Sequence, residues 1–287
     1  MSERIRTILI LGAAKGIGEA MARRFHHLGK TVIVTGRQVE EDQLAQLAED
    51  LPGLEYRVVG SSQFNLLSDE WDLTHLETLG TQVQRILTDF PTLDTVFVNA
   101  GIQSHYQLFQ DPPPDHADVL AELMTNLAAP ILVAHAFAHH LLAQARAGTP
   151  TTLFLTSSSL AYFPVAFYPV YCATKAGIAA FTKSLRAQLQ ETGCAAMNIV
   201  EVVPPYVDTE LNAAHRWQTD RLQGGPDKAV QPMPLEQYID QFFRALQAGK
   251  GPDGSLREEI GVGFGARGAE VWRDGWQRLL RASGMAE

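Results

Sequence analysis

The sequence predicts an α/β fold, a doubly wound parallel sheet with helices on both faces. Short apolar or β-branched runs, of the length typical of buried parallel strands, recur along the chain. Stretches with apolar residues at helical spacing separate these runs, and such alternation is typical of doubly wound sheets. No internal repeat or low-complexity linker divides the sequence, so we expect a single domain over residues 1–287.

The short runs predicted as strands are Thr7–Leu11, Thr31–Thr35, Glu55–Val59, Thr95–Val98, Thr152–Thr156, Met197–Val203 and Glu259–Val262. The longer periodic stretches predicted as helices are Ile17–Leu28, Leu73–Phe90, His116–Ala147, Ala173–Gln190 and Leu235–Ala248. The Gly- and Pro-rich stretches at 224–234 and 249–254 are predicted as surface loops.

Composition and charge exclude several classes of protein. With 46% hydrophobic and 19% charged residues, the chain has enough apolar material for a core and is neither disordered nor collagen-like. The net charge of −9 argues against nucleic acid or an anionic membrane as a partner, because either needs a basic surface. Cys172 and Cys194 form no disulfide framework, which indicates free thiols in a reducing cytosol.

Neither a membrane span nor a leader is expected. No apolar run reaches the ~18–20 residues that cross a bilayer. Arg4 and Arg6 precede an apolar run over 7–14 that mimics a signal peptide, but the run is short and ends at Lys15. We interpret it as a strand with its turn, and we expect a cytoplasmic protein.

The first predicted strand runs into a glycine turn, Gly12-x3-Gly16-x-Gly18. Glycine permits positive φ and a close approach of the backbone to a ligand, and a helix N-terminus binds phosphate. The spacing matches neither Gly-x-Gly-x-x-Gly nor a Walker loop, and by itself an ordinary turn explains it as well. Its place after the first strand of an alternating chain favours a dinucleotide site.

A second glycine cluster, Gly263, Gly265 and Gly268, matches Gly-x-Gly-x-x-Gly literally. A βαβ unit needs ~30 residues and a second strand, and too few residues follow. We therefore predict a flexible loop before a helix over Ala269–Arg281.

Tyr171 and Lys175 lie four residues apart at the start of a predicted helix, so their side chains share one face. A nearby cation favours the phenolate and brings the pKa of a tyrosine toward the working range of an acid–base group. Ser158 follows a predicted strand, where a hydroxyl is well placed to bind a substrate oxygen. A Tyr-x3-Lys pair alone is most often a surface pair, but the serine and the glycine turn together argue against coincidence.

These motifs resemble those of the short-chain dehydrogenases/reductases. The resemblance covers roughly residues 5–211 and implies a Rossmann-like fold of seven parallel strands, and an oxidoreductase that transfers hydride between a nicotinamide and a carbonyl or alcohol. The matching positions are Gly12-x3-Gly16-x-Gly18, Asn99-Ala100-Gly101, Asn126, Ser158, Tyr171-x3-Lys175 and Pro204-x2-Val207-x-Thr209.

The family's catalytic roles carry over to four positions. The resemblance implies that Tyr171 is the general acid or base, that Lys175 lowers its pKa and holds the nicotinamide ribose, and that Ser158 binds the reacting oxygen. Asn126 would position a water that links Lys175 to solvent. The cofactor-binding residues implied are Gly12, Lys15, Gly16, Ile17, Gly18, Arg37, Asp72, Leu73, Asn99, Ala100, Gly101, Tyr171, Lys175, Pro204, Val207 and Thr209.

The end of the second strand bears on the choice of cofactor. Gly36 stands where NAD-preferring members carry an acid, and Arg37 follows it. Lys15 adds a cation within the glycine turn. Both charges are consistent with NADP(H), although each also fits an ordinary surface residue. We expect NADP(H) in preference to NAD(H).

The sequence departs from the family pattern at three places. Leu11 replaces a threonine, and Pro205 replaces a glycine and removes a donor beside the nicotinamide pocket. Asp72 and Leu73 match the adenine-binding motif only if residues 61–71 are an insertion. None of these departures affects the proposed acid–base residues, but Pro205 leaves the pocket geometry open.

Aromatic side chains gather near the predicted site, namely Tyr162, Phe163, Phe167, Tyr168, Tyr206 and Trp217. A mostly apolar pocket is typical of small-molecule sites, so we expect a hydrophobic carbonyl substrate and a substrate-binding loop near 205–235. Core packing explains these residues equally well. The family resemblance implies a homodimer or homotetramer packed through the helices at 116–147 and 173–190.

Two other functions stay open. A nucleotide-binding regulatory protein without turnover would keep the pocket, and a reductase of an imine or activated double bond would use the same residues. A metal site is not expected, because His135 and His139 have a suitable spacing but no third ligand. A serine hydrolase is disfavoured because Gly-x-Ser-x-Gly is absent around Ser158.

Overall fold

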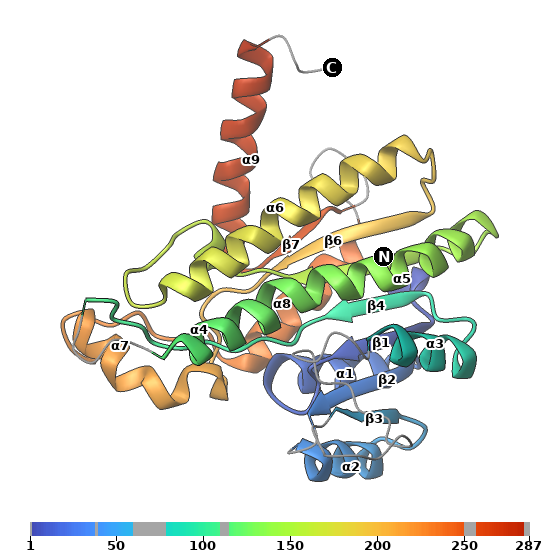
Figure 1. The fold of residues 1–287 in the computed structure, drawn as a ribbon, viewed down its shortest axis with the longest axis horizontal. Coiled ribbons are helices and arrows are strands. Elements are labelled where there is room, and N and C mark those ends of the chain that lie inside the picture. The colour runs from blue at the N-terminus through green and yellow to red at the C-terminus, as the bar shows by residue number, and fades with distance from the viewer. Residues whose placement is uncertain (1, 38–39, 60–78, 110–114, 250–256, 284–287) are drawn as a thin grey trace.

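The computed structural model describes residues 2–37, 40–59, 79–109, 115–249 and 257–283. Its centre is a parallel seven-stranded sheet in the order β3-β2-β1-β4-β5-β6-β7 (Figure 1). The α/β class and the seven parallel strands are thereby confirmed. The strands are β1 Thr7–Leu11, β2 Thr31–Arg37, β3 Glu55–Val59, β4 Thr95–Val98, β5 Thr151–Thr156, β6 Met197–Val203 and β7 Glu259–Gly261.

Helices cover both faces of the sheet (Figure 1). The α-helices are α1 Gly16–His27, α2 Glu41–Asp50, α3 Leu79–Asp89, α4 His116–Leu123, α5 Ala129–Arg146, α6 Pro169–Glu191, α7 Arg216–Leu222, α8 Leu235–Ala248 and α9 Phe264–Ala282. Alternate residues of β1 belong to separate cores: Ile8 and Ile10 to one cluster, Leu9 and Leu11 to the other. This two-sided burial explains why the strands are continuous apolar runs.

The strand order indicates where on the sheet a ligand would bind. β1 pairs with both β2 and β4, so the chain reverses its direction of progress across the sheet between β1 and β4. In an open α/β sheet, ligands bind in the crevice at the carboxyl ends of the strands on either side of that reversal. The glycine turn after β1 and the segment after β4 both begin at that edge.

Several predicted boundaries were wrong. The helix predicted over His116–Ala147 is interrupted by a π-helical turn at Met124–Ala128, and α6 begins at Pro169 rather than Ala173. Helix α2 was not predicted, because Glu41–Asp50 has only two buried side chains to mark its inner face. Of the helix predicted over Leu73–Phe90, the described part is α3.

The second glycine cluster is not the flexible loop that was predicted. Gly263 has a φ of +54° and precedes α9, which begins at Phe264. A Cβ at Gly265 would lie 2.2 Å from the Val203 carbonyl oxygen, and one at Gly268 would lie 2.9 Å from the Tyr162 side chain. These glycines let α9 pack closely on the sheet, and the rest of α9 extends away from the body (Figure 1).

One helical stretch, His116–Arg146, is long and apolar enough to cross a membrane by length and composition alone. Its inner face is part of a core cluster, since Val133, Phe137 and Leu141 pack there against the sheet. Apolar composition in a helix that covers a sheet is the ordinary consequence of such packing.

Candidate active site

A glycine turn joins β1 to α1 at the carboxyl edge of the sheet. The backbone N–H groups of Gly12 and Ala13 donate to the Thr35 carbonyl oxygen at 3.0 and 2.9 Å, which ties the turn to β2. Gly12 has a φ of +80°, and a Cβ there would lie 2.6 Å from the Ala100 Cα. A Cβ at Gly18 would lie 2.0 Å from the Gly12 carbonyl oxygen. Neither position has room for a side chain.

The turn leads directly into the N-terminus of α1. Gly16, with a φ of +60°, is the first residue of the helix, and Ile17 and Gly18 complete its first turn with Glu19. Backbone N–H groups in a first helical turn have no intrahelical acceptor and bind phosphate oxygens well. The turn therefore fits the pyrophosphate of a dinucleotide.

The segment after β4 connects the glycine turn to the interior of the site. The Asn99 side-chain amide donates to the Gly12 carbonyl oxygen at 2.9 Å, and Ala100 packs directly against Gly12. A Cβ at Gly101 would lie 3.5 Å from the Lys175 ammonium nitrogen. The three residues Asn99, Ala100 and Gly101 thus lie between the glycine turn and Lys175.

Ser158 follows β5 and lies beside Tyr171. The Ser158 hydroxyl accepts from the Leu160 N–H at 3.1 Å, and it approaches the Tyr171 phenol closely enough to lower the pKa of that phenol. Tyr171 lies in the first turn of α6 and is only 7% exposed. Burial raises the pKa of the Tyr171 phenol, and the approach of the Ser158 hydroxyl partly offsets that rise.

Lys175 lies one turn further along α6 and is 3% exposed. Its ammonium group donates to the Thr156 carbonyl oxygen at 3.0 Å and lies 5.5 Å from the centre of the Tyr171 ring. Burial lowers the pKa of Lys175 to about 8, against the opposing charge of Glu122. The pair is therefore an interior pair, not the surface pair that Tyr-x3-Lys spacing most often represents.

Asn126 lies within the π-helical turn between α4 and α5. Its carboxamide donates to the Ile102 carbonyl oxygen at 2.7 Å and accepts from the Ile102 N–H at 2.9 Å. The same amide nitrogen lies 3.5 Å from the Thr174 hydroxyl, next to Lys175. Asn126 therefore connects the segment after β4 to α6, and its Oδ1 would lie 3.3 Å from a Cβ at Gly101.

The segment after β6 folds back over the glycine turn. The Pro204 carbonyl oxygen accepts from the Ser159 N–H at 2.9 Å, and Val207 is buried. The Thr209 side chain lies 3.5 Å from the position of a Cβ on Gly16. The structure thus brings together predicted residues that are almost two hundred positions apart in the sequence.

The end of β2 carries a charge pair that sequence reasoning missed. The Arg37 guanidinium donates to Glu40 at 2.6 Å, and the Arg37 backbone N–H donates to the same carboxylate at 3.0 Å. The bonds with Arg37 outweigh the effect of burial and lower the pKa of Glu40. Lys15, the other predicted cation, pairs with Glu210 at 3.2 Å.

This geometry agrees with comparisons to known proteins. A family model described as short chain dehydrogenase matches residues 6–220 of the chain. The chain belongs to the short-chain dehydrogenase/reductase family. The resemblance expected over roughly residues 5–211 is thereby confirmed. The protein is an oxidoreductase of this family, acting between an alcohol and a carbonyl group with a nicotinamide cofactor.

Two curated relatives cover most of the chain. The "Uncharacterized oxidoreductase DltE" of Bacillus subtilis is 32% identical over 244 residues, which are 85% of each protein. "Sulfoacetaldehyde reductase 2" of Chromohalobacter salexigens is 30% identical over 236 residues, which are 82% of this chain and 86% of the relative.

Solved structures share the fold at lower identity. A short-chain dehydrogenase from Sphingobium yanoikuyae in complex with NADPH has a TM-score of 0.70 and 21% identity, over 96% of both chains. One from Burkholderia phymatum in complex with NAD has a TM-score of 0.70 and 17% identity, over 98% of this chain and 96% of that one. Structures with this fold therefore hold either nicotinamide dinucleotide.

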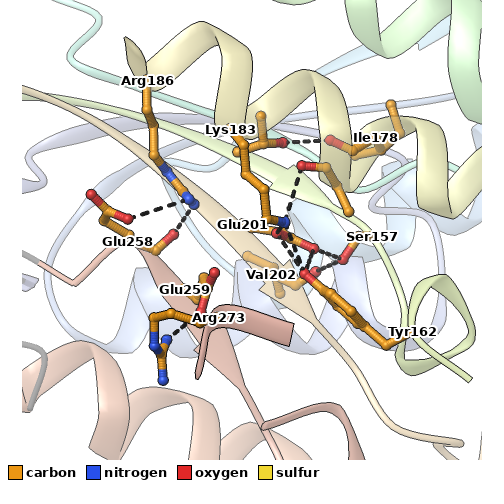
Figure 2. Close-up of polar contacts among 12 residues, drawn as sticks. Ser157, Tyr162, Ile178, Lys183, Arg186, Glu201, Val202, Glu258, Glu259 and Arg273 are labelled. Atoms are coloured by element: carbon orange, nitrogen blue, oxygen red, sulfur yellow. Dashed lines mark hydrogen bonds and ion pairs between the residues drawn. The ribbon is translucent and has the colours of Figure 1, made fainter. Parts of the chain in front are cut away.

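A buried polar network includes Ser157, the residue before Ser158 (Figure 2). At its centre the fully buried Glu201 carboxylate accepts from the Ser157 hydroxyl at 2.5 Å and from the Tyr162 hydroxyl at 2.9 and 3.0 Å. The Lys183 ammonium donates to Glu201 at 3.2 Å and to the Tyr162 hydroxyl at 3.1 Å. The network holds the residue before Ser158 against β6.

The same network connects α6 and the sheet to α9. The Lys183 ammonium lies 4.3 Å from the centre of the Trp272 ring, and Arg273 pairs with Glu259 at 2.6 Å. Arg186 donates to the backbone carbonyl oxygen of Glu258 (Figure 2). Burial raises the pKa of Glu259, and the nearby Glu201 charge adds to that rise.

The predicted aromatic set divides into two groups. Phe167 and Tyr168 pack edge to face at 4.8 Å, and His105 lies 6.3 Å from the Phe167 ring and from His215. Tyr168 hydrogen-bonds to Thr219 at 2.7 Å. Phe167 and Tyr168 lie just before Tyr171 in the chain. Through His105 and Thr219 they contact the segments after β4 and β6.

The other predicted aromatics lie elsewhere. Tyr162 belongs to the Glu201 network, and Phe163 packs on Phe264 of α9 at 4.4 Å. Trp217 is 62% exposed. Core and surface packing therefore account for part of the set.

Two predicted cofactor residues, Asp72 and Leu73, lie outside the described residues.

Sequence reasoning missed Glu122, a fully buried carboxylate on α4. A glutamate among the apolar residues one helical turn before Asn126 was the available signal, since a carboxylate is almost never fully buried unless it is paired.

Proposed function

We propose that this protein is an NADP(H)-dependent oxidoreductase that interconverts a ketone or aldehyde and a secondary alcohol, with Tyr171 as general acid and base. The observation that supports this proposal is the buried cluster of Ser158, Tyr171 and Lys175 at the carboxyl edge of the sheet. The cluster adjoins the glycine turn, because Gly101 lies between that turn and Lys175.

The chain's own residues manage the proton and the geometry. A bound nicotinamide supplies or accepts the hydride. Ser158 donates a hydrogen bond to the substrate oxygen, and Tyr171 donates a proton to the same oxygen during reduction. The Lys175 ammonium stabilises the resulting phenolate, and Asn126 holds the adjoining backbone and positions a water toward Lys175. In oxidation the same groups act in reverse.

Two cations, one at the end of β2 and one at the glycine turn, support the proposed preference for NADP(H). Arg37 is more than half exposed at the end of β2, where an arginine is suited to a 2′-phosphate, and Lys15 lies at the turn. Glu40 pairs with Arg37 at 2.6 Å, and we propose that a bound 2′-phosphate displaces this carboxylate from the guanidinium. Asn99, Pro204, Val207 and Thr209 complete the proposed cofactor contacts.

The substrate that we propose is a hydrophobic carbonyl compound, bound beside Phe167 and Tyr168 and covered by residues 205–235. The second candidate substrate is a small carbonyl compound that carries an acidic group. It is favoured by His105, whose buried Nε2 has no hydrogen-bond partner, and by the relative described as a sulfoacetaldehyde reductase.

We also propose a cytoplasmic homodimer or homotetramer. Exposed leucines on α4 and α5, Leu120 and Leu132, support the face at 116–146 as the contact surface. Free cysteines are consistent with a reducing compartment.

Oxidation of NADPH or NADH with a panel of carbonyl compounds tests the activity, with wild type compared to Tyr171→Phe. We expect turnover that the substitution reduces by at least about 100-fold while nucleotide affinity is retained. Nucleotide binding without Tyr171-dependent turnover would instead identify a regulatory binder. Imines and activated alkenes in the same panel test the remaining alternative.

A further inference from the structure

Glu122 is a buried carboxylate for which the reaction described so far has no use. It lies on α4, one turn before Asn126, and its side chain is fully buried. Neither carboxylate oxygen makes a hydrogen bond of normal geometry. Burying a carboxylate without partners is costly, so its presence calls for a compensating charge.

That charge comes from α6. Lys175 acts on Glu122 electrostatically, and Glu122 in turn acts on Lys175, Tyr171 and Cys172. α4 packs along α6, which brings the carboxylate to the catalytic pair. Among the described residues, Glu122 is the acid whose charge acts on Lys175.

The segment after β4 closes the other side of the carboxylate. The Tyr106 hydroxyl and the Ser104 backbone N–H approach Glu122, and both lower its pKa. Tyr106 is itself buried and its hydroxyl has no well-formed hydrogen bond. Asp118, on α4 with Glu122, raises the pKa of Tyr106 through its charge. The Glu122 carboxylate therefore has a favourable ammonium neighbour, Lys175, and no well-formed hydrogen bond that would neutralise its charge. Its negative charge can therefore stabilise the Lys175 ammonium.

The electrostatics of the pair are balanced near neutral pH. Burial raises the pKa of Glu122 to about 7, and burial lowers the pKa of Lys175 to about 8. Each group favours the charged form of the other, so the two titrate as a coupled pair.

We propose that Glu122 is a positioning residue of the reaction, whose buried carboxylate keeps the Lys175 ammonium charged and so extends to higher pH the range in which Tyr171 functions. This inference rests on the proposed function, because it assigns Tyr171 and Lys175 their acid–base roles. In this role Glu122 makes no contact with substrate and acts through its charge on the Lys175 and Tyr171 pair.

The first experiment compares pH profiles of kcat/KM for carbonyl reduction in wild type and Glu122→Gln. Glutamine keeps the shape of the side chain and removes its charge. We expect the alkaline limb to move to lower pH by about one unit, which is about a tenfold loss of kcat/KM at pH 8.5. Glu122→Asp, which keeps the charge, restores most of the alkaline limb.

The matched control is Asp94→Asn. Asp94 is also a buried carboxyl with a pKa raised by burial, but it precedes β4 at the amino end of the strand and accepts from the Thr7 N–H at 3.0 Å. Its substitution leaves the alkaline limb unchanged. A similar shift in Asp94→Asn and Glu122→Gln would overturn the proposal, because loss of any buried carboxyl would then suffice.

The second experiment needs neither cofactor nor turnover. A double-mutant cycle of Glu122→Gln and Lys175→Met measures the coupling of the two groups in unfolding of the protein without nucleotide at pH 7.5. We expect a coupling of about tenfold in the unfolding equilibrium constant. Additive substitutions would overturn the proposal. A wild type without turnover but with this coupling would instead contradict the proposed function and leave the pairing intact.

Discussion

The Lys175 ammonium nitrogen lies 5.5 Å from the centre of the Tyr171 ring. Both side chains are buried, so little water screens the interaction of the ammonium with a phenolate. The helical spacing brings the two groups to the same face of α6, and the sheet and α4 exclude solvent from them. The proposed acid–base chemistry depends on this arrangement.

Lys175→Met removes the cation and should lower kcat for carbonyl reduction by about 10²–10⁴-fold, because the Tyr171 phenolate loses its stabilising charge. Steady-state kinetics from pH 6 to 10 measure the loss. A variant with kcat within threefold of wild type across that range would contradict the assigned role of the lysine.

The same substitution should change how stability depends on pH. The pKa of Lys175 falls from its ordinary value of 10.5 to about 8, so the folded protein binds fewer protons than the unfolded chain between these values. Wild type should therefore gain stability relative to Lys175→Met as the pH rises from about 8 to 10.5. Urea unfolding at half-unit intervals measures the difference, and a constant difference would contradict the lowered pKa.

Gly12→Ala should destabilise the protein by more than about 3 kcal/mol, because the φ is positive and the Cβ meets the Ala100 backbone at 2.6 Å. Gly29→Ala is the control. Gly29 has a φ of +72° but nothing within 4 Å of its Cβ position, so backbone strain alone should cost about 1 kcal/mol. Equal losses in urea unfolding would show that the close approach to Ala100 has no energetic effect.

Glu201→Ala should cost about 3–5 kcal/mol, because it leaves the Lys183 ammonium and the Tyr162 hydroxyl without their buried acceptor. Glu270→Ala is the matched control, since Glu270 forms an exposed pair with Arg267 at 3.6 Å and its loss should cost less than about 0.5 kcal/mol. Chemical denaturation of both variants makes the comparison. A small loss for Glu201→Ala would mean that the network adds little to stability.

Arg37→Asp should raise KM for NADPH by about 10–100-fold and leave KM for NADH within a few-fold, because a charge-assisted phosphate contact is lost. Glu40→Gln should lower KM for NADPH, since the carboxylate no longer competes with the 2′-phosphate for Arg37. Weaker binding of NADH to Glu40→Gln, with no effect on NADPH, would indicate that Glu40 binds a ribose hydroxyl and that the protein prefers NAD(H).

Local sequence patterns were sufficient for the strands and for Tyr171 with Lys175. Buried parallel strands are apolar on both faces, and residues four apart share a helix face in any helix, so neither inference needs a distant contact. The same reasoning failed at the second glycine cluster. Close packing of Gly265 on Val203 and of Gly268 on Tyr162 gives no local signal that separates it from a flexible loop.

Helix interruptions were also beyond local reasoning. The π-helical turn at Met124–Ala128 falls in a stretch whose apolar residues recur at helical spacing on both sides of it, so periodicity predicts one helix there. Asn126 bonds both backbone groups of Ile102 from that turn. The contact lies between segments that are distant in the chain, and no spacing within 116–147 records it.

By itself the sequence determined the class of fold, the glycine turn after β1 and the shared helix face of Tyr171 and Lys175, because each depends on residues within one or two neighbouring elements. Only the tertiary structure decided which carboxylates lie close to the predicted site residues. Glu201 meets Ser157 and Lys183 from another strand, and Glu122 acts on Lys175 from another helix. The strength of a charge depends on its burial and its neighbours, and these arise only when the elements pack together.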